Sequence, residues 1–112
     1  MKIAIVGSRG IKSIKLDKYV SNDDEIISGG AKGVDSLAAD YARRNNIRLT
    51  EILPQYEKYK RAAPIIRNRE IVDLADCVIA FWDGESRGTL SVINYAKKVG
   101  KECRVIIEKD GE

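Results

Sequence analysis

The fold of this chain is decided by residues 25–42, which read EIISGGAKGVDSLAADYA. The apolar pair Ile26 and Ile27 predicts a strand, and apolar residues at helical spacing after Gly33 predict a helix. A glycine-rich turn, residues 28–33, joins the two. Strand, glycine turn and helix bring backbone N–H groups and a helix N-terminus to one point, which favours phosphate. We therefore expect a site for a phosphate-bearing ligand, and the alternative is a tight turn without a ligand.

Apolar runs and helical patterns alternate along the rest of the chain. Strands are expected at residues 2–6, 25–28, 47–53, 77–82 and 104–107, and helices at residues 11–22, 34–45, 65–75 and from residue 89 to about 99. Continuous apolar runs suit strands that are buried on both faces. The alternation predicts an α/β fold: one three-layer, Rossmann-like domain over residues 1–112, with a mostly parallel sheet of about five strands and helices on both faces.

Three glycine-containing turns follow predicted strands, at residues 7–10, 28–33 and 83–89. The carboxyl ends of parallel strands share one edge of the sheet, and ligands of such folds bind outside that edge. The convergence of three such turns on one edge is the strongest indication of a site in the chain.

Composition sets wide limits on function. The net charge is +3, with 44% hydrophobic and 33% charged residues, as in an ordinary soluble globular protein. The small positive excess is compatible with an anionic ligand but does not by itself indicate nucleic acid. No apolar stretch has the length of a membrane span or a signal peptide, so we expect a cytoplasmic protein without a membrane partner.

Histidine is absent from the chain, and its two cysteines are Cys77 and Cys103. Ser-His-Asp and Cys-His catalysis are therefore excluded within the chain, and the ligand set of a zinc site is lacking. We expect no metal and no cofactor, and we expect both cysteines to be reduced thiols in strands.

Two motifs of nucleotide-binding proteins fit poorly. Residues 28–33 approach the dinucleotide fingerprint with Ser28 in place of its first glycine, and Glu51 lies near the position of the expected acidic residue. That turn normally follows the first strand, whereas here it follows the second, so a nicotinamide dehydrogenase is disfavoured. The glycine and spacing of a P-loop are also missing.

Two features leave alternatives open. Residues 54–64 interleave Tyr56 and Tyr59 with basic side chains, which could clamp nucleotides; the alternative is a solvated connector. Asn68 falls on the apolar side of the helix expected at residues 65–75. A polar amide there needs a partner, so it either caps neighbouring backbone or reaches a ligand pocket.

Five motifs occur in order along the chain: IVGSR (5–9), SGGAKGVD (28–35), RNREI (67–71), LAD (74–76) and SRGT (86–89). On these motifs the chain resembles the SLOG superfamily of Rossmann-like nucleotide-ligand domains. Within it, the chain looks most similar to the Rossmann domain of the DNA-processing protein A (Smf) family and its small stand-alone relatives. The resemblance runs from Ile3 to about Ile107. It implies a nucleotide-derived ligand or single-stranded nucleic acid at the glycine-rich edge, and frequent homodimers.

The resemblance and the three turns together define the candidate ligand-binding residues. These are Gly7, Ser8, Arg9, Ser28, Gly29, Gly30, Ala31, Gly33, Asp35, Arg67, Asn68, Arg69, Asp83, Gly84, Gly88 and Thr89. Backbone N–H groups of residues 29–33 and 88–89 would cradle phosphate, and Arg9 with Arg67 or Arg69 would supply charge-assisted hydrogen bonds. Asp35 would either hold ribose hydroxyls or cap its own helix.

The lonely-guy phosphoribohydrolases of the same superfamily split a base from a nucleoside monophosphate with a catalytic glutamate. The Gly88-Thr89 pair could align with their signature, but the glutamate position is Val92 here. Acid catalysis would then fall to Asp83 or Glu85, and an enzyme is disfavoured. The favoured function is binding of a nucleotide or nucleotide-derived ligand by a sensor or signalling module. The alternatives are single-stranded DNA or RNA binding and nucleotide N-glycosidic hydrolysis.

Overall fold

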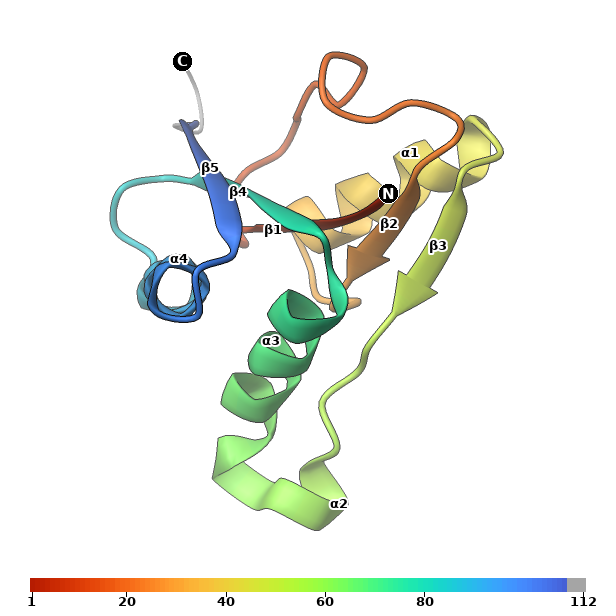
Figure 1. Ribbon diagram of the computed structural model, residues 1–112. Coiled ribbons are helices and arrows are strands. Elements are labelled where there is room, and N and C mark those ends of the chain that lie inside the picture. Colours follow the sequence, from red (N-terminus) through yellow and green to blue (C-terminus); the bar gives the residue numbers. More distant parts are fainter. Residues whose placement is uncertain (109–112) are drawn as a thin grey trace.

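A five-stranded sheet forms the centre of the computed structural model, which describes residues 1–108 (Figure 1). The strands are β1 (Lys2–Gly7), β2 (Glu25–Ser28), β3 (Arg48–Glu51), β4 (Cys77–Trp82) and β5 (Glu102–Ile107). Their order in the sheet is β3-β2-β1-β4-β5, and every neighbouring pair runs parallel. The predicted Rossmann-like α/β fold is therefore confirmed.

Helices and one irregular segment cover the two faces of the sheet. The helices are α1 (Val34–Arg44), α2 (Tyr56–Tyr59), the 3-10 helix η1 (Lys60–Ala62), α3 (Ala63–Leu74) and α4 (Arg87–Lys98). On one face α1 and the β1–β2 connection pack on Ile3, Ile5 and Ile26. On the other face α3 and α4 pack on Ala4, Val6 and Ile27 (Figure 1). Adjacent strand residues thus serve opposite cores, which explains why the strands read as continuous apolar runs.

The helix predicted at residues 11–22 is absent, and this prediction was wrong. The segment contains turns in which the N–H groups of Tyr19 and Val20 both donate to Leu16 O, at 2.9 and 3.0 Å. Its apolar residues Ile11, Leu16 and Val20 are all buried. On a helix, Ile11 and Leu16 would point about 140° apart, so a single helix could not bury both. A looped segment turns each of them inward.

Other differences concern element ends. The predicted strand at residues 47–53 is shorter, and residues 54–64 contain α2 and η1 rather than a loop alone. The last helix begins at Arg87, two residues earlier than predicted. Pro64 lies at the start of α3, where the missing proline N–H costs nothing. The polar tail expected from residue 109 lies outside the described residues.

Cys77 and Cys103 lie in β4 and β5, as predicted, and both are free thiols. Burial raises the pKa of each thiol, which lowers its reactivity. Every helix within residues 1–108 falls short of the length and apolarity that a membrane span requires.

The sheet order places a crevice beside β1. The chain leaves β1 toward β2 on one side, whereas β4 lies on its other side, with Gly7 paired to Phe81 at the carboxyl ends. Such a reversal of strand order opens a crevice where ligands of doubly wound sheets bind. The predicted turns at residues 7–10 and 83–89 both border it.

Candidate functional site

A pocket of about 450 Å³ lies in this crevice. It collects residues from the first turn, the glycine turn, α3 and the turn into α4. The predicted site residues that line it are Gly7, Arg9, Ala31, Asp35, Arg67, Asn68, Asp83, Gly88 and Thr89. Segments that are distant in sequence thus meet at the carboxyl edge of the sheet.

Ser8 connects the first turn to the turn before α4. Its side chain is 1% exposed, and its Oγ accepts a hydrogen bond from the Asp83 N–H at 3.2 Å. The same Oγ lies 3.5 Å from Thr89 Oγ1, which is also buried. Ser8 is therefore placed beneath the pocket, where it holds two of its walls together instead of lining it.

Arg67 is the buried cation of the pocket, with 8% of its surface exposed. Its Nη1 donates to Gly29 O at 2.7 Å, and its Nε donates to Asn68 Oδ1 at 2.8 Å. These bonds use only part of the five-donor guanidinium, which borders the pocket. Arg67 is therefore fixed in place and can still bind an anion.

Asn68 has the partner that its position required. Its Oδ1 accepts from Arg67 Nε, and the half-buried side chain also lines the pocket. The two alternatives expected from the sequence were a cap of neighbouring backbone and a position at a ligand pocket. Asn68 borders the pocket, and it also orients the charged side chain of Arg67. With the oxygen occupied, its NH₂ group is the end that can donate to a ligand.

Asp35 lies near Arg67, since a Cβ at Gly29 would meet both side chains, and it is 8% exposed. Its Oδ2 accepts from the Ala31 N–H at 3.2 Å, so it holds the glycine turn in place, and the N-cap of α1 has no side-chain hydrogen bond. Burial raises the pKa of this carboxyl, while the Ala31 N–H and the positive charge of Arg67 act in the opposite direction. A buried carboxyl of this kind can accept hydrogen bonds from hydroxyl groups.

The glycine turn itself is largely filled by protein. A Cβ at Gly33 would lie 2.5 Å from Arg9 O, and the Gly33 φ is 79°. A Cβ at Gly29 would lie 2.8 Å from Arg67 Nη1. These glycines let other parts of the chain approach closely.

The other small residues of the predicted site are packed in the same way. A Cβ at Gly7 would lie 2.4 Å from Phe81 O, and one at Gly30 would lie 2.5 Å from Leu53 Cδ2. Ser28 is fully buried, and its Oγ donates to Asp35 O at 3.4 Å. Ala31 is the residue of this turn that lines the pocket, and its N–H already serves Asp35.

The turn into α4 is open, in contrast to the glycine turn. A Cβ at Gly88 would meet nothing within 4 Å, and the same holds for Gly10, which also lines the pocket. Ser86 caps α4, because its Oγ accepts from the Thr89 N–H at 3.3 Å. The N–H groups of Arg87 and Gly88 precede the first α-helical bond, so they have no partner within the helix. This helix start, beside empty space, is suited to an anion.

Asp83 and Glu85 are the two candidate acids that the sequence offers for hydrolysis. Asp83 lines the pocket, and its Oδ1 accepts from the N–H groups of Ser86 and Glu85, both at 2.8 Å. These bonds lower the pKa of Asp83. A carboxyl that is ionised in this way is a poor proton donor near neutral pH. Glu85 is exposed and is not among the pocket-lining residues.

Two predicted residues lie elsewhere. Arg69 points away from the pocket, with its guanidinium carbon 5.5 Å from the centre of the Tyr95 ring. Gly84 is exposed, with a φ of 86° that the turn after β4 requires. The basic and aromatic residues of 54–64 also lie outside the pocket lining.

Some pocket residues were not predicted. Gly10, Ser86 and Val92 line the pocket together with Val6, Pro64 and Ile71. Gly10 and Ser86 belong to turns that the sequence marked, but nothing in their own pattern separated them from ordinary turn residues. The apolar pattern of their helices predicts Ile71 and Val92 as core residues, and both do pack in the core as well as line the pocket.

The arrangement defines the class of the molecule: a Rossmann-like α/β domain with a polar pocket at the reversal of its strand order. Residues 1–59 match the model of the YspA, cpYpsA-related SLOG family, YAcAr. The match covers more than half of the 112 residues, so the chain belongs to this family. Membership of the SLOG superfamily is confirmed, and the nearer similarity to the DNA-processing protein A family stays a prediction. No curated protein and no solved structure matches the chain.

Proposed function

We propose that the chain binds a nucleotide or nucleotide-derived ligand in this pocket and acts as a sensor or signalling module. The observation that carries the proposal is the open start of α4. Free space over Gly88 and Gly10 lies next to backbone N–H groups, and Arg9 and Arg67 line the same pocket. Membership of a SLOG family is compatible with nucleotide-related binding.

The pocket offers two kinds of group that can bind a nucleotide. Phosphate is expected at the α4 start, where helix N–H groups and arginines supply charge-assisted hydrogen bonds. Sugar hydroxyls are expected at Asp35, which lies beside the glycine turn. Of the two phosphate cradles expected from the sequence, the proposal therefore uses the one at residues 88–89.

Binding is proposed in preference to hydrolysis. The position of the phosphoribohydrolase glutamate is Val92, which is 4% exposed and packs in the core. The remaining candidate, Asp83, has a lowered pKa and is a poor acid at neutral pH.

The test uses Gly88→Leu, which fills the open space without displacing protein atoms near the new Cβ. Thermal unfolding is measured with nucleoside mono-, di- and triphosphates and ADP-ribose, each at two salt concentrations. A ligand at one hundred times its Kd stabilises the folded state by about 2.7 kcal/mol. We expect this shift for the wild type and for Ser36→Leu, a matched exposed position in the first turn of α1. A folded Gly88→Leu protein with the full shift would contradict the proposal.

A further inference from the structure

A second cavity adjoins the pocket. It is a groove of about 480 Å³ between α3 and α4, and it shares Asn68 and Val92 with the pocket. Helices α3 and α4 lie side by side over one face of the sheet (Figure 1). The two spaces therefore form one continuous surface that begins at the sheet edge and runs out between the helices.

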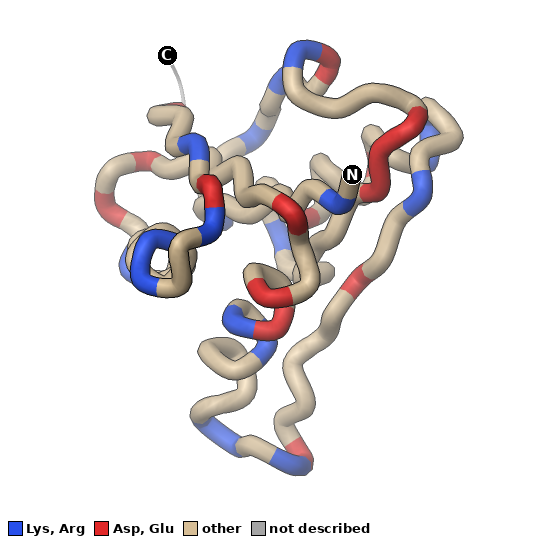
Figure 2. The backbone as a smooth tube through the Cα atoms, viewed as in Figure 1, with Lys and Arg blue, Asp and Glu red and all other residues tan. Residues whose placement is uncertain are grey.

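The two spaces differ in charge. The pocket is lined by Arg9 and Arg67 but also by Asp35 and Asp83. The groove is lined by Arg69, Arg87 and Lys98, and none of its described lining residues is acidic. Figure 2 shows basic positions on α4 and, mixed with acidic ones, on α3. The groove is thus the more electropositive of the two cavities.

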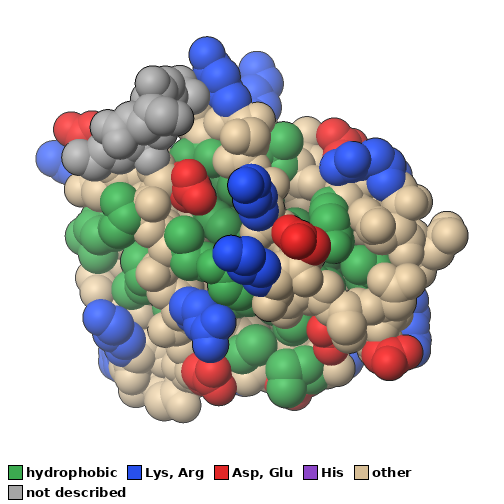
Figure 3. All heavy atoms as spheres, turned by 90° about the horizontal axis from the view of Figure 1, so that it is seen from above, with side chains coloured by type: hydrophobic (Ala, Val, Ile, Leu, Met, Phe, Trp, Pro, Cys, Tyr) green, Lys and Arg blue, Asp and Glu red, His purple; other side chains and the backbone are tan. Residues whose placement is uncertain are grey.

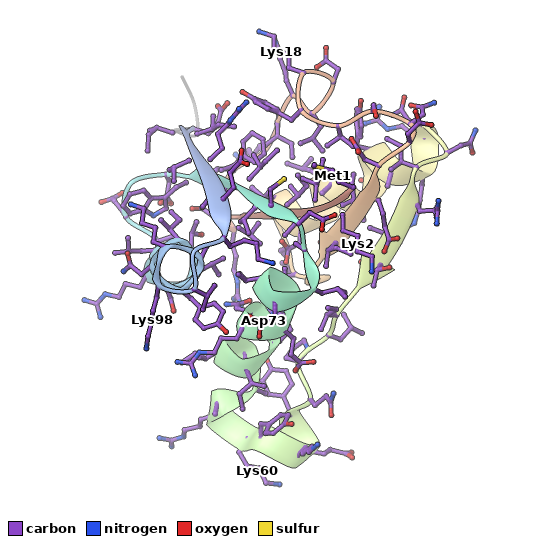
Figure 4. All side chains as sticks on the ribbon, in the orientation of Figure 1. Met1, Lys2, Lys18, Lys60, Asp73 and Lys98 are labelled. Carbon is purple, nitrogen blue, oxygen red and sulfur yellow. The ribbon has the colours of Figure 1, made fainter. Side chains whose placement is uncertain are left out.

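One carboxylate of α3, that of Asp73, contacts a residue that lines the groove. Asp73, which Figure 4 places on α3 across from Lys98 of α4, accepts a hydrogen bond from the Tyr95 hydroxyl at 2.8 Å. Tyr95 in turn lies under Arg69. Arg69 and Tyr95 both line the groove, and a guanidinium group and an aromatic ring are the two kinds of side chain on which a nucleobase stacks.

The face of the molecule that is seen from above differs from the groove in its distribution of charge. In Figure 3, basic and acidic side chains are interspersed among hydrophobic ones. An anionic ligand that extends out of the pocket into the groove meets three cationic side chains there. Its second phosphate would therefore be attracted electrostatically to the groove.

We infer that the ligand contains at least two nucleotide units joined through phosphate. The first unit occupies the pocket, and the second lies in the α3–α4 groove, with its phosphate near Arg69, Arg87 and Lys98 and its base against Tyr95. This inference rests on the proposed function and extends it. A free dinucleotide and a stretch of single-stranded nucleic acid share this chemistry.

The experiment compares the affinities of the four nucleoside 5′-monophosphates, the four 5′-phosphorylated homodinucleotides and a twelve-residue single strand. The groove variant is Arg69→Gln with Lys98→Gln. Its matched control is Lys15→Gln with Lys18→Gln, two exposed cations, of which Lys18 lies far from Lys98 in Figure 4. Circular dichroism and thermal melts establish that both variants fold.

We expect a dinucleotide to bind about tenfold or more tightly than its monophosphate, and we expect the groove variant alone to lose this advantage while monophosphate affinity stays unchanged. Equal affinities, or an advantage that survives in the folded groove variant, would overturn the inference and leave mononucleotide binding intact. Absence of binding by any probe would overturn both proposals. A groove variant with an altered oligomeric state, measured by sedimentation, would assign the groove to a second copy of the chain and also overturn the inference.

The source of the ligand follows from the third probe. A twelve-residue strand that binds more tightly than the dinucleotide, with steep salt dependence, supports single-stranded nucleic acid as the source. Equal affinity of strand and dinucleotide supports a free dinucleotide.

Discussion

The turns at residues 28–33 and 83–89 both follow a strand, contain glycines and lead into a helix, yet they use their glycines in opposite ways. In the first turn, glycine gives room to the protein, because the Arg9 backbone and the Arg67 side chain occupy the space of the missing Cβ atoms. In the second turn, the space beside Gly88 is empty. A glycine-rich turn therefore indicates that another group approaches the backbone closely, but it does not indicate whether that group belongs to the protein or to a ligand.

The largest expected effect tests the packed turn. Gly33→Ala forces a side chain into a backbone with φ 79° and ψ −127°, and against the Arg9 backbone. We expect the free energy of unfolding in urea to fall by about 3 kcal/mol or more. Gly88→Ala is the matched control, with an expected change within about 1 kcal/mol because alanine favours a helix. Equal losses in the two variants would remove the distinction between the turns.

A smaller effect is expected from the cation that links the packed turn to the pocket. Arg67→Met leaves Gly29 O and Asn68 Oδ1 without their donor and removes positive charge beside Asp35. We expect a loss of about 2 kcal/mol in the free energy of unfolding, together with loss of nucleotide binding. Arg69→Met, on the same helix but exposed, should leave stability nearly unchanged. A stable Arg67→Met protein that binds normally would show that this arginine serves neither region.

The smallest effect concerns pH and the buried Asp35. Its pKa is raised above the ordinary value of 3.8, chiefly by burial. Between 3.8 and the raised value, the folded state binds more protons than the unfolded state, so the contribution of Asp35 to stability falls as pH rises through this window. We expect urea midpoints of the wild type to decrease relative to Asp35→Asn as the pH rises above 3.8.

The exposed variant Asp17→Asn serves as control for this pH dependence. It should follow the wild type across the range. If Asp35→Asn also runs parallel to the wild type, the carboxyl gains enough from Arg67 and the Ala31 N–H to offset its burial.

Strands and helices could be predicted from the sequence where their apolar residues follow a periodic or continuous pattern. The β4 run of residues 77–82 and the helix α1 were predicted to within a residue, because burial on both faces or on one helical stripe leaves a direct imprint on residue order. The segment of residues 11–22 carries its apolar residues without a consistent period, and only its packing on the sheet determined its shape.

The candidate site likewise has features that the sequence predicts and features that depend on tertiary contacts. The alternation of strands and helices and the three glycine-containing turns could be predicted from the sequence, because apolar periodicity and glycine positions are properties of short stretches of chain. Three features of the site depend on tertiary contacts: the bond from Arg67 to Gly29 O, the contact of Arg69 with Tyr95, and which glycines face protein and which face open space. Those outcomes depend on which distant segments come within a few ångströms of each other, and contacts of that range leave no periodic signal in the chain.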